Sequence, residues 1–138
     1  MKCKMLVLAL LLFAGPRLFS QAVPYNVVFD LTTDDTTVHQ RVIRWITMIE
    51  KSNPDAKLEV VFYGKSLAMA EQEKSTVADA IKKLSANKNV AFRVCEVAMK
   101  AHKVEKSQLI AGVGTVPDGL YEIISKQAQG YGYIKVVQ

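Results

Sequence analysis

Cysteine and histidine are scarce in this sequence, with two of each among 138 residues. Cys3 precedes an apolar run at the amino terminus, so Cys95 is the one cysteine in the rest of the chain. A single cysteine cannot form a disulfide within its own chain, and one cysteine with two histidines is a poor set of zinc ligands. Cys95 is therefore a buried inert thiol, a thiol joined to another molecule, or a thiol kept for chemistry.

Long hydrophobic runs are also lacking. The apolar stretch from Leu6 to Ala14 has nine residues, whereas a membrane-spanning helix needs about 20. Lys2 and Lys4 precede this stretch, and the small residues at 20–22 follow it, which is typical of a secretory signal. We predict a signal peptide over residues 1–22 and a periplasmic or secreted domain over residues 23–138, without stable membrane insertion after cleavage.

The chain has little excess charge. The leader contributes three of the eighteen basic residues and none of the thirteen acidic ones, so the rest has a net charge of +2. This small value does not indicate a nucleic-acid partner. Motifs of common enzyme classes are incomplete. Glu59 occupies the position where a phosphate-binding loop ending in "GKS" requires glycine, and "GVGTVP" lacks the third glycine of a dinucleotide fingerprint. No serine lies in the G-x-S-x-G elbow of a hydrolase. We predict neither a cofactor nor a metal.

The remaining chain alternates short apolar runs with amphipathic stretches. Strands are predicted at 25–31, 58–63, 90–94, 110–116 and 133–137. Helices are predicted after a cap at Asp34 or Asp35, at 76–86, at 97–103 and from Pro117-Asp118 to Gly130. The last helix is expected to turn four side chains inward: Leu120, Ile123, Ile124 and Ala128. Apolar strands that alternate with such helices indicate a parallel sheet covered on both faces. The fold class is therefore a single three-layer α/β/α domain.

With these elements placed, four stretches allow a comparison with known families: "YNVVFDLTTDD", "VVFYG", "VAFRVCEVAMKAHKV" and "VGTVPDGLYEIISKQAQGYGYIKV". Through these stretches the sequence resembles the DsrE/DsrF-like family of sulfur-handling proteins. The resemblance implies a mostly parallel five-stranded sheet and assembly into homo-oligomers. In sulfur-transferring members it also implies a cysteine that carries persulfide sulfur, and Cys95 occupies that position. A sulfur donor or acceptor protein would then be a partner.

The local sequence around Cys95 leaves two interpretations open. Cys95 follows a predicted strand and precedes a helix, so it is expected at the carboxyl edge of the sheet, where ligands and reactive groups gather. A helix start favours thiolate by about 0.3–1 kcal/mol, which the adjacent carboxylate of Glu96 could cancel. Arg93 lies two residues upstream on the same strand face, roughly 6.5–7 Å away, and is a candidate for binding an anionic donor. The alternatives are a sulfur carrier and a structural thiol.

Two further side chains are candidates for the site. His102 follows Cys95 by seven residues, a rise of about 10.5 Å on a continuous helix, so only a helix break or a second subunit would join them. Asp30 is a carboxylate within a buried strand and needs a partner. Asp30, Asp34 and Asp35 together could bind Mg²⁺ or Ca²⁺. Helix capping accounts for Asp34 and Asp35 without a metal and is the preferred interpretation. Three lysines form a weakly basic rim that could attract thiosulfate-like anions: Lys100, Lys103 and Lys106. A solvent-exposed face is the preferred explanation for these lysines.

Overall fold

The structure, a computed structural model, describes residues 23–137, and the predicted signal peptide lies outside the described residues. The strands are β1 (Val27–Leu31), β2 (Leu58–Phe62), β3 (Val90–Cys95), β4 (Gly114–Val116) and β5 (Gly132–Val136). The helices are α2 (Thr36–Ser52), α3 (Leu67–Ala70), α4 (Ala78–Ser85), α5 (Glu96–His102) and α6 (Gly119–Ala128), with 3₁₀ turns η2 (Gly64–Ser66) and η3 (Lys106–Gln108). All strand pairs are parallel, in the order β4-β3-β2-β1-β5.

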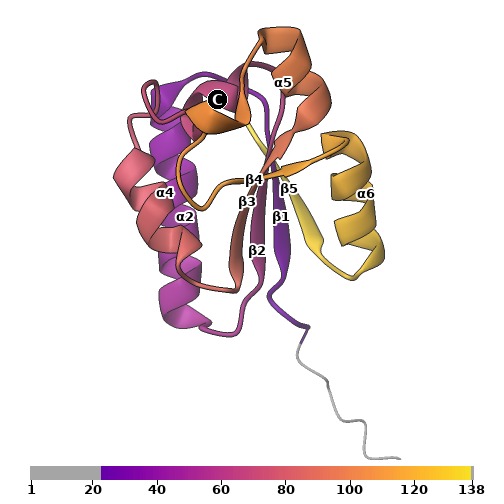
Figure 1. Cartoon of the computed structure of the whole chain (residues 1–138). Helices are drawn as coiled ribbons and strands as arrows, with labels where there is room; N and C mark the ends of the chain where they lie inside the picture. Colours follow the sequence, from indigo (N-terminus) through magenta and orange to yellow (C-terminus); the bar gives the residue numbers. More distant parts are fainter. Residues whose placement is uncertain (1–22, 138) are drawn as a thin grey trace, which may run out of the picture.

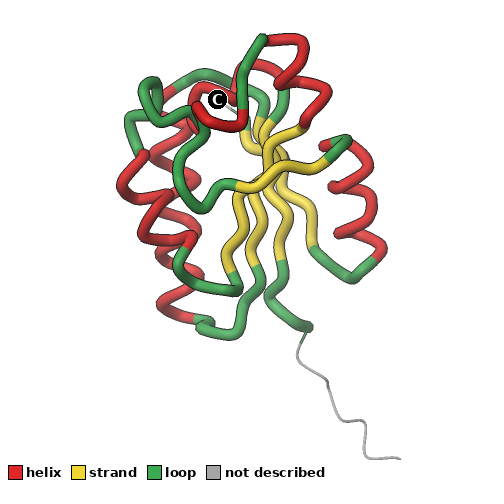
Figure 2. The backbone as a smooth tube through the Cα atoms, in the orientation of Figure 1, coloured by secondary structure: helices red, strands yellow, loops and turns green. Residues whose placement is uncertain are grey.

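Helices cover both faces of the sheet, with α2 and α4 on one side and α6 on the other (Figure 1). The strands lie side by side between these helices, and loops connect the elements at both ends of the sheet (Figure 2). The three-layer α/β/α fold and the five-stranded sheet are thus confirmed. No helix within residues 23–137 combines the length and the apolar character needed to cross a membrane.

The two faces of the sheet differ in chemistry because strand side chains alternate between them. The face beneath α2 and α4 is apolar on the three central strands: Val27, Phe29, Leu31, Leu58, Val60, Phe62, Val90, Phe92 and Val94. The face beneath α6 carries Val28 and Val61, which pack with Ile123, together with polar and charged side chains. The larger part of the core therefore lies on the α2 and α4 side.

Local signals in the sequence explain where the long helices begin. Asp35 caps α2 by accepting a hydrogen bond from the amide of Thr37 at 2.8 Å, and Asp118 caps α6 by accepting one from the amide of Leu120 at 2.8 Å. Four side chains of α2 recur at helical spacing and are buried: Val38, Val42, Ile46 and Ile49. Capping thus places the start of both helices, and periodicity identifies the buried face of α2.

One part of the predicted packing is wrong. Leu120 and Ile124 of α6 are 57% and 62% exposed, and Ala128 is exposed as well, so Ile123 is the only one of the four expected residues that is buried. The reason is that α6 lies alone on its face of the sheet and buries only a narrow stripe. The predicted strand at 110–116 is also shorter than expected, because only residues 114–116 pair with β3.

Candidate functional site

Cys95 is the last residue of β3 and the residue immediately before α5. Its side chain is on the sheet face that α6 covers, and the residue is 6% exposed. The start of α6 closes over it, because a Cβ atom added to Gly119 would lie 3.0 Å from the Cys95 Cβ and 3.5 Å from its Sγ. Glycine at position 119 therefore lets the start of α6 pack closely against the Cys95 Cβ and Val61.

Asp30 is buried on the same face and its carboxylate is well satisfied. The Tyr133 hydroxyl donates to its Oδ2 at 2.6 Å, and the Lys135 ammonium donates to its Oδ1 at 2.9 Å. Asp30 and Lys135 are direct partners in the register of β1 and β5. The hydrogen bond to Asp30 raises the pKa of Tyr133 to about 12, so that this phenol stays protonated at neutral pH. The partner that a carboxylate in a buried strand requires is thus present.

Tyr63 extends this polar cluster. Its ring lies under the Lys135 ammonium, 5.4 Å from the nitrogen, and its hydroxyl is 3.5 Å from that nitrogen. Burial and the Asp30 carboxylate raise the Tyr63 pKa. The Tyr63 phenol therefore adds a protonated hydroxyl to the polar groups around Asp30.

Glu96 does not act on Cys95 as an isolated charge. Its Oε1 accepts a hydrogen bond from Thr115 at 2.7 Å and forms an ion pair with Lys106 at 2.8 Å. The Lys106 and Thr115 hydrogen bonds hold the pKa of Glu96 below its usual value. Because a lysine neutralises it locally, Glu96 opposes a thiolate at position 95 less than the sequence suggested.

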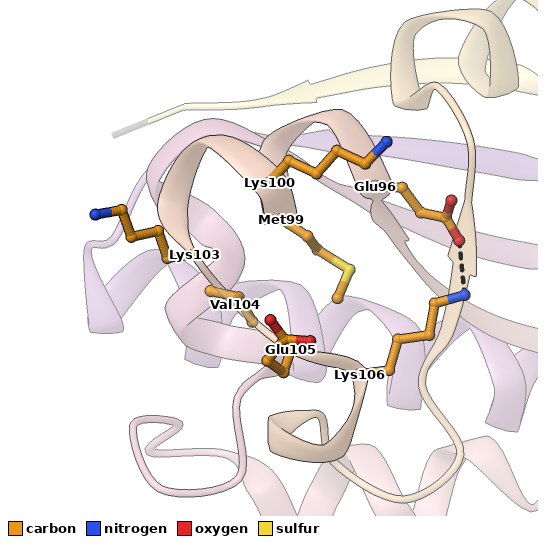
Figure 3. Close-up of a pocket in the computed structure, with 7 residues that line it drawn as sticks. All are labelled: Glu96, Met99, Lys100, Lys103, Val104, Glu105 and Lys106. Carbon is orange, nitrogen blue, oxygen red and sulfur yellow. Dashed lines mark ion pairs between the residues drawn. The ribbon is translucent and has the colours of Figure 1, made fainter.

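The basic rim borders a cavity of about 410 Å³ between α5 and the segment that leads into η3. Met99 points into this space, and the ion pair between Glu96 and Lys106 closes one side of it (Figure 3). Lys103 points away from Met99 in this view (Figure 3). The cavity is therefore an apolar hollow with a charged border, and Cys95 does not line it.

The structure does not bring His102 to the sulfur. Helix α5 is continuous from Glu96 to His102, so the two residues are separated by its full length. His102 instead lines a different cavity of about 350 Å³, together with Asp34, Lys65 and Lys74. Within a single subunit, His102 is thus not a base for Cys95.

Arg93 shares a sheet face with Cys95 but takes part in another cavity. Its guanidinium lies over β4, where a Cβ on Gly114 would clash with it, and its Nη1 donates to the Phe92 carbonyl at 3.5 Å. Arg93 lines a cavity of about 300 Å³ with Glu59 and Lys126, at the start of β2 and β3. The predicted pairing of Arg93 with an anion at Cys95 therefore has no support from the geometry.

The three early aspartates are not assembled into a metal site. Asp35 caps α2, Asp34 is exposed, and Asp30 is bonded to Lys135. Among residues 23–137, no cluster of three or more histidine, cysteine or carboxylate side chains could hold a metal ion.

Sequence reasoning missed three residues of this region, Tyr63, Tyr133 and Lys135. The alternation of side chains along a strand could have placed Tyr63 on the face of Cys95. The contacts of Tyr133 and Lys135 with Asp30 depend on β5 lying beside β1, and strand order cannot be read from a single sequence.

The comparisons with known proteins agree with this architecture. The model of the DsrE/DsrF-like family matches residues 26–136. A protein of unknown function from Methanobacterium thermoautotrophicum, MTH1491, has a similar structure, with a TM-score of 0.75 and 24% identity over 80% of this chain and 98% of that one. The ychN protein from E. coli has a TM-score of 0.66 and 14% identity over 81% of this chain and 98% of that one. No curated protein matches the chain.

Proposed function

Because the chain belongs to the DsrE/DsrF-like family, whose members are generally related to sulfur relay, we propose that it is an exported sulfur-relay protein in which Cys95 accepts sulfane sulfur as a persulfide. The observation that carries the proposal is the position of Cys95 at the carboxyl edge of β3, directly before α5. This edge is where open α/β sheets gather reactive groups.

The proposed transfer is a thiol exchange without net oxidation. The Cys95 thiolate attacks the terminal sulfur of a protonated donor persulfide, R–S–SH, and the sulfur–sulfur bond of the donor breaks as the new one forms. The products are the Cys95 persulfide, Cys95–S–SH, and the thiolate R–S⁻, so atoms and charge balance. Lys135, 3.5 Å from the Tyr63 hydroxyl and paired with Asp30, would provide positive charge on the same face of the sheet.

The intact mass of the protein after incubation with polysulfide tests this proposal. The expected gain is one sulfur atom per chain, removable by reducing agent. Cys95→Ser should abolish the gain, whereas Glu73→Gln, at an exposed position in the same domain, is the matched control and should retain it. The absence of uptake by the native protein would overturn the proposal.

The burial of Cys95 favours a second candidate, a non-catalytic oligomeric scaffold with a structural thiol. The residue is 6% exposed, and its neighbours Ala98 and Met99 belong to the same apolar core. Alkylation of the native protein at graded pH separates the two functions. Labelling near neutral pH supports the relay, whereas labelling only after denaturation supports the scaffold.

Assembly with further subunits is part of the proposal. Val97 on α5 and Leu120 and Ile124 on α6 are exposed apolar side chains near the carboxyl edge, with 57–62% of each accessible. Such residues are favourable contacts in an interface between copies of the chain. A partner subunit on α6 would also control access to Cys95, because α6 begins over the sulfur.

A further inference from the structure

At the opposite edge of the sheet, Glu59 is a buried carboxylate with incomplete hydrogen bonding. The residue is 3% exposed, and its Oε2 pairs with the Lys126 ammonium at 2.9 Å. Its Oε1 is closed off from water and has no hydrogen-bond partner within the described part of the chain. An unpaired buried acceptor of this kind is costly, so it points to a donor that the isolated chain does not supply.

The cavity of about 300 Å³ that Glu59 lines is otherwise basic. Lys57 and Lys88 precede β2 and β3, Arg93 reaches in from β3, and Lys126 comes from the end of α6. Among residues 23–137, Lys57, Lys88 and Arg93 form no ion pair. Three cations without carboxylate partners around one hollow favour an anionic ligand.

Glu59 is ionised at pH 7.5 despite its burial. Burial raises its pKa to about 6, against the opposing effect of Lys126, and Glu122 on α6 contributes to the rise. Lys126 is 3.6 Å from Glu122 and so is shared between the two carboxylates. At pH 7.5 Glu59 is thus a carboxylate that accepts hydrogen bonds and cannot donate them.

A carboxylate inside a basic cavity selects among anions. It repels an oxyanion that has no proton, such as sulfate, because both groups only accept hydrogen bonds. It accepts a hydrogen bond from an oxyanion that still carries a hydroxyl, such as hydrogen phosphate. Because Oε1 is closed off in the structure, binding of such an anion requires rotation of the Glu59 carboxylate, whose terminal torsion is broad.

We propose that the cavity between Glu59, Arg93 and Lys88 is a binding site for hydrogen phosphate. The free cations neutralise its charge, and its hydroxyl donates to the unpaired oxygen of Glu59. The site lies at the amino edge of β2 and β3, so it does not depend on the sulfur chemistry proposed for Cys95 at the carboxyl edge.

Calorimetric titration of the purified protein with phosphate and with sulfate, at pH 7.5 and matched ionic strength, tests the site. Both ions are mainly dianions at this pH, so they differ chiefly in the hydroxyl. We expect phosphate to bind about tenfold more tightly than sulfate, the effect of one hydrogen bond to a charged group. Equal affinities, or no binding of either ion, would overturn the proposal.

Variants separate a built site from general attraction to positive charge. Glu59→Gln keeps the size of the side chain but can donate to sulfate through its amide, so phosphate and sulfate should bind within about twofold of each other. Arg93→Gln should weaken both ions. Glu73→Gln and Lys51→Gln alter exposed residues outside the cavity and should leave the preference unchanged. A preference that survives in Glu59→Gln would also refute the proposal.

Discussion

Replacing Glu59 by glutamine should change how the stability of the fold depends on pH. In the folded protein, burial raises the pKa of Glu59 from 4.5 to about 6. Because the folded value is above the unfolded one, the contribution of this group to stability is fully present below pH 4.5 and is lost as pH rises through 6. The glutamine variant has no such group and should not show this loss.

The size of this stability change follows from the pKa shift of Glu59. At 1.36 kcal/mol per pKa unit, a rise from 4.5 to about 6 corresponds to about 2 kcal/mol, and solvent screening of a site beside a cavity reduces this to about 1 kcal/mol. Between pH 4.5 and pH 7.5, the free energy of unfolding of Glu59→Gln should therefore rise by about 1 kcal/mol relative to the native protein.

Urea unfolding at pH 4.5, 6 and 7.5 measures this difference. The fluorescence of Trp45 is a suitable signal, because this single tryptophan stacks on Phe29 with ring centroids 6.4 Å apart. The buffers should contain neither phosphate nor sulfate, so that binding at the cavity does not contribute. Glu73→Gln, at an exposed position, is the matched control. A pH-independent difference, or one of opposite sign, would refute the assignment of the raised pKa to Glu59.

Three further predictions concern the α6 face and the carboxyl edge of the sheet. Lys135→Met should lower the free energy of unfolding by about 1–3 kcal/mol, because Asp30 loses its cation. Adding Asp30→Asn should restore part of this loss. A double variant whose loss equals the sum of the two single losses would contradict the pairing. Gly119→Ala should slow alkylation of Cys95 and cost about 1–3 kcal/mol by overpacking, whereas unchanged labelling would show that α6 does not cover the sulfur. Leu120→Ser combined with Ile124→Ser should lower the particle mass in sedimentation and leave the unfolding free energy per chain within about 0.5 kcal/mol; an unchanged mass would exclude α6 from the interface.

Most of the fold was predictable because its signals are local. Capping by Asp35 and Asp118, the stripe of Val38, Val42 and Ile46, and the apolar strand runs each depend on residues close in sequence. The prediction that Leu120 and Ile124 are buried was wrong for a different reason. Their helical spacing predicts an apolar face, but whether that face meets the sheet or a second subunit depends on how many helices share the side of the sheet.

The candidate sites were less accessible to sequence reasoning, because strand order and side-chain reach determine them. Cys95 and Asp30 could be singled out by residue type, and the structure places both on the sheet face that α6 covers. Alternation correctly put Arg93 on the face of Cys95. It could not show that this side chain also lines the cavity of Glu59, a residue considered only as a departure from a phosphate-binding loop.

The unequal covering of the sheet accounts for where the chemistry lies. Two helices, α2 and α4, cover one face, and the side chains of the central strands there are apolar. On the other face a single helix of ten residues, about 15 Å long, cannot cover the five strands from end to end. Polar side chains are found at both ends of α6. Cys95 lies under its first turn, and Glu59 forms an ion pair with Lys126 in its last turn. Because α6 spans the distance between them, a ligand at one end and sulfur chemistry at the other are compatible in the same chain.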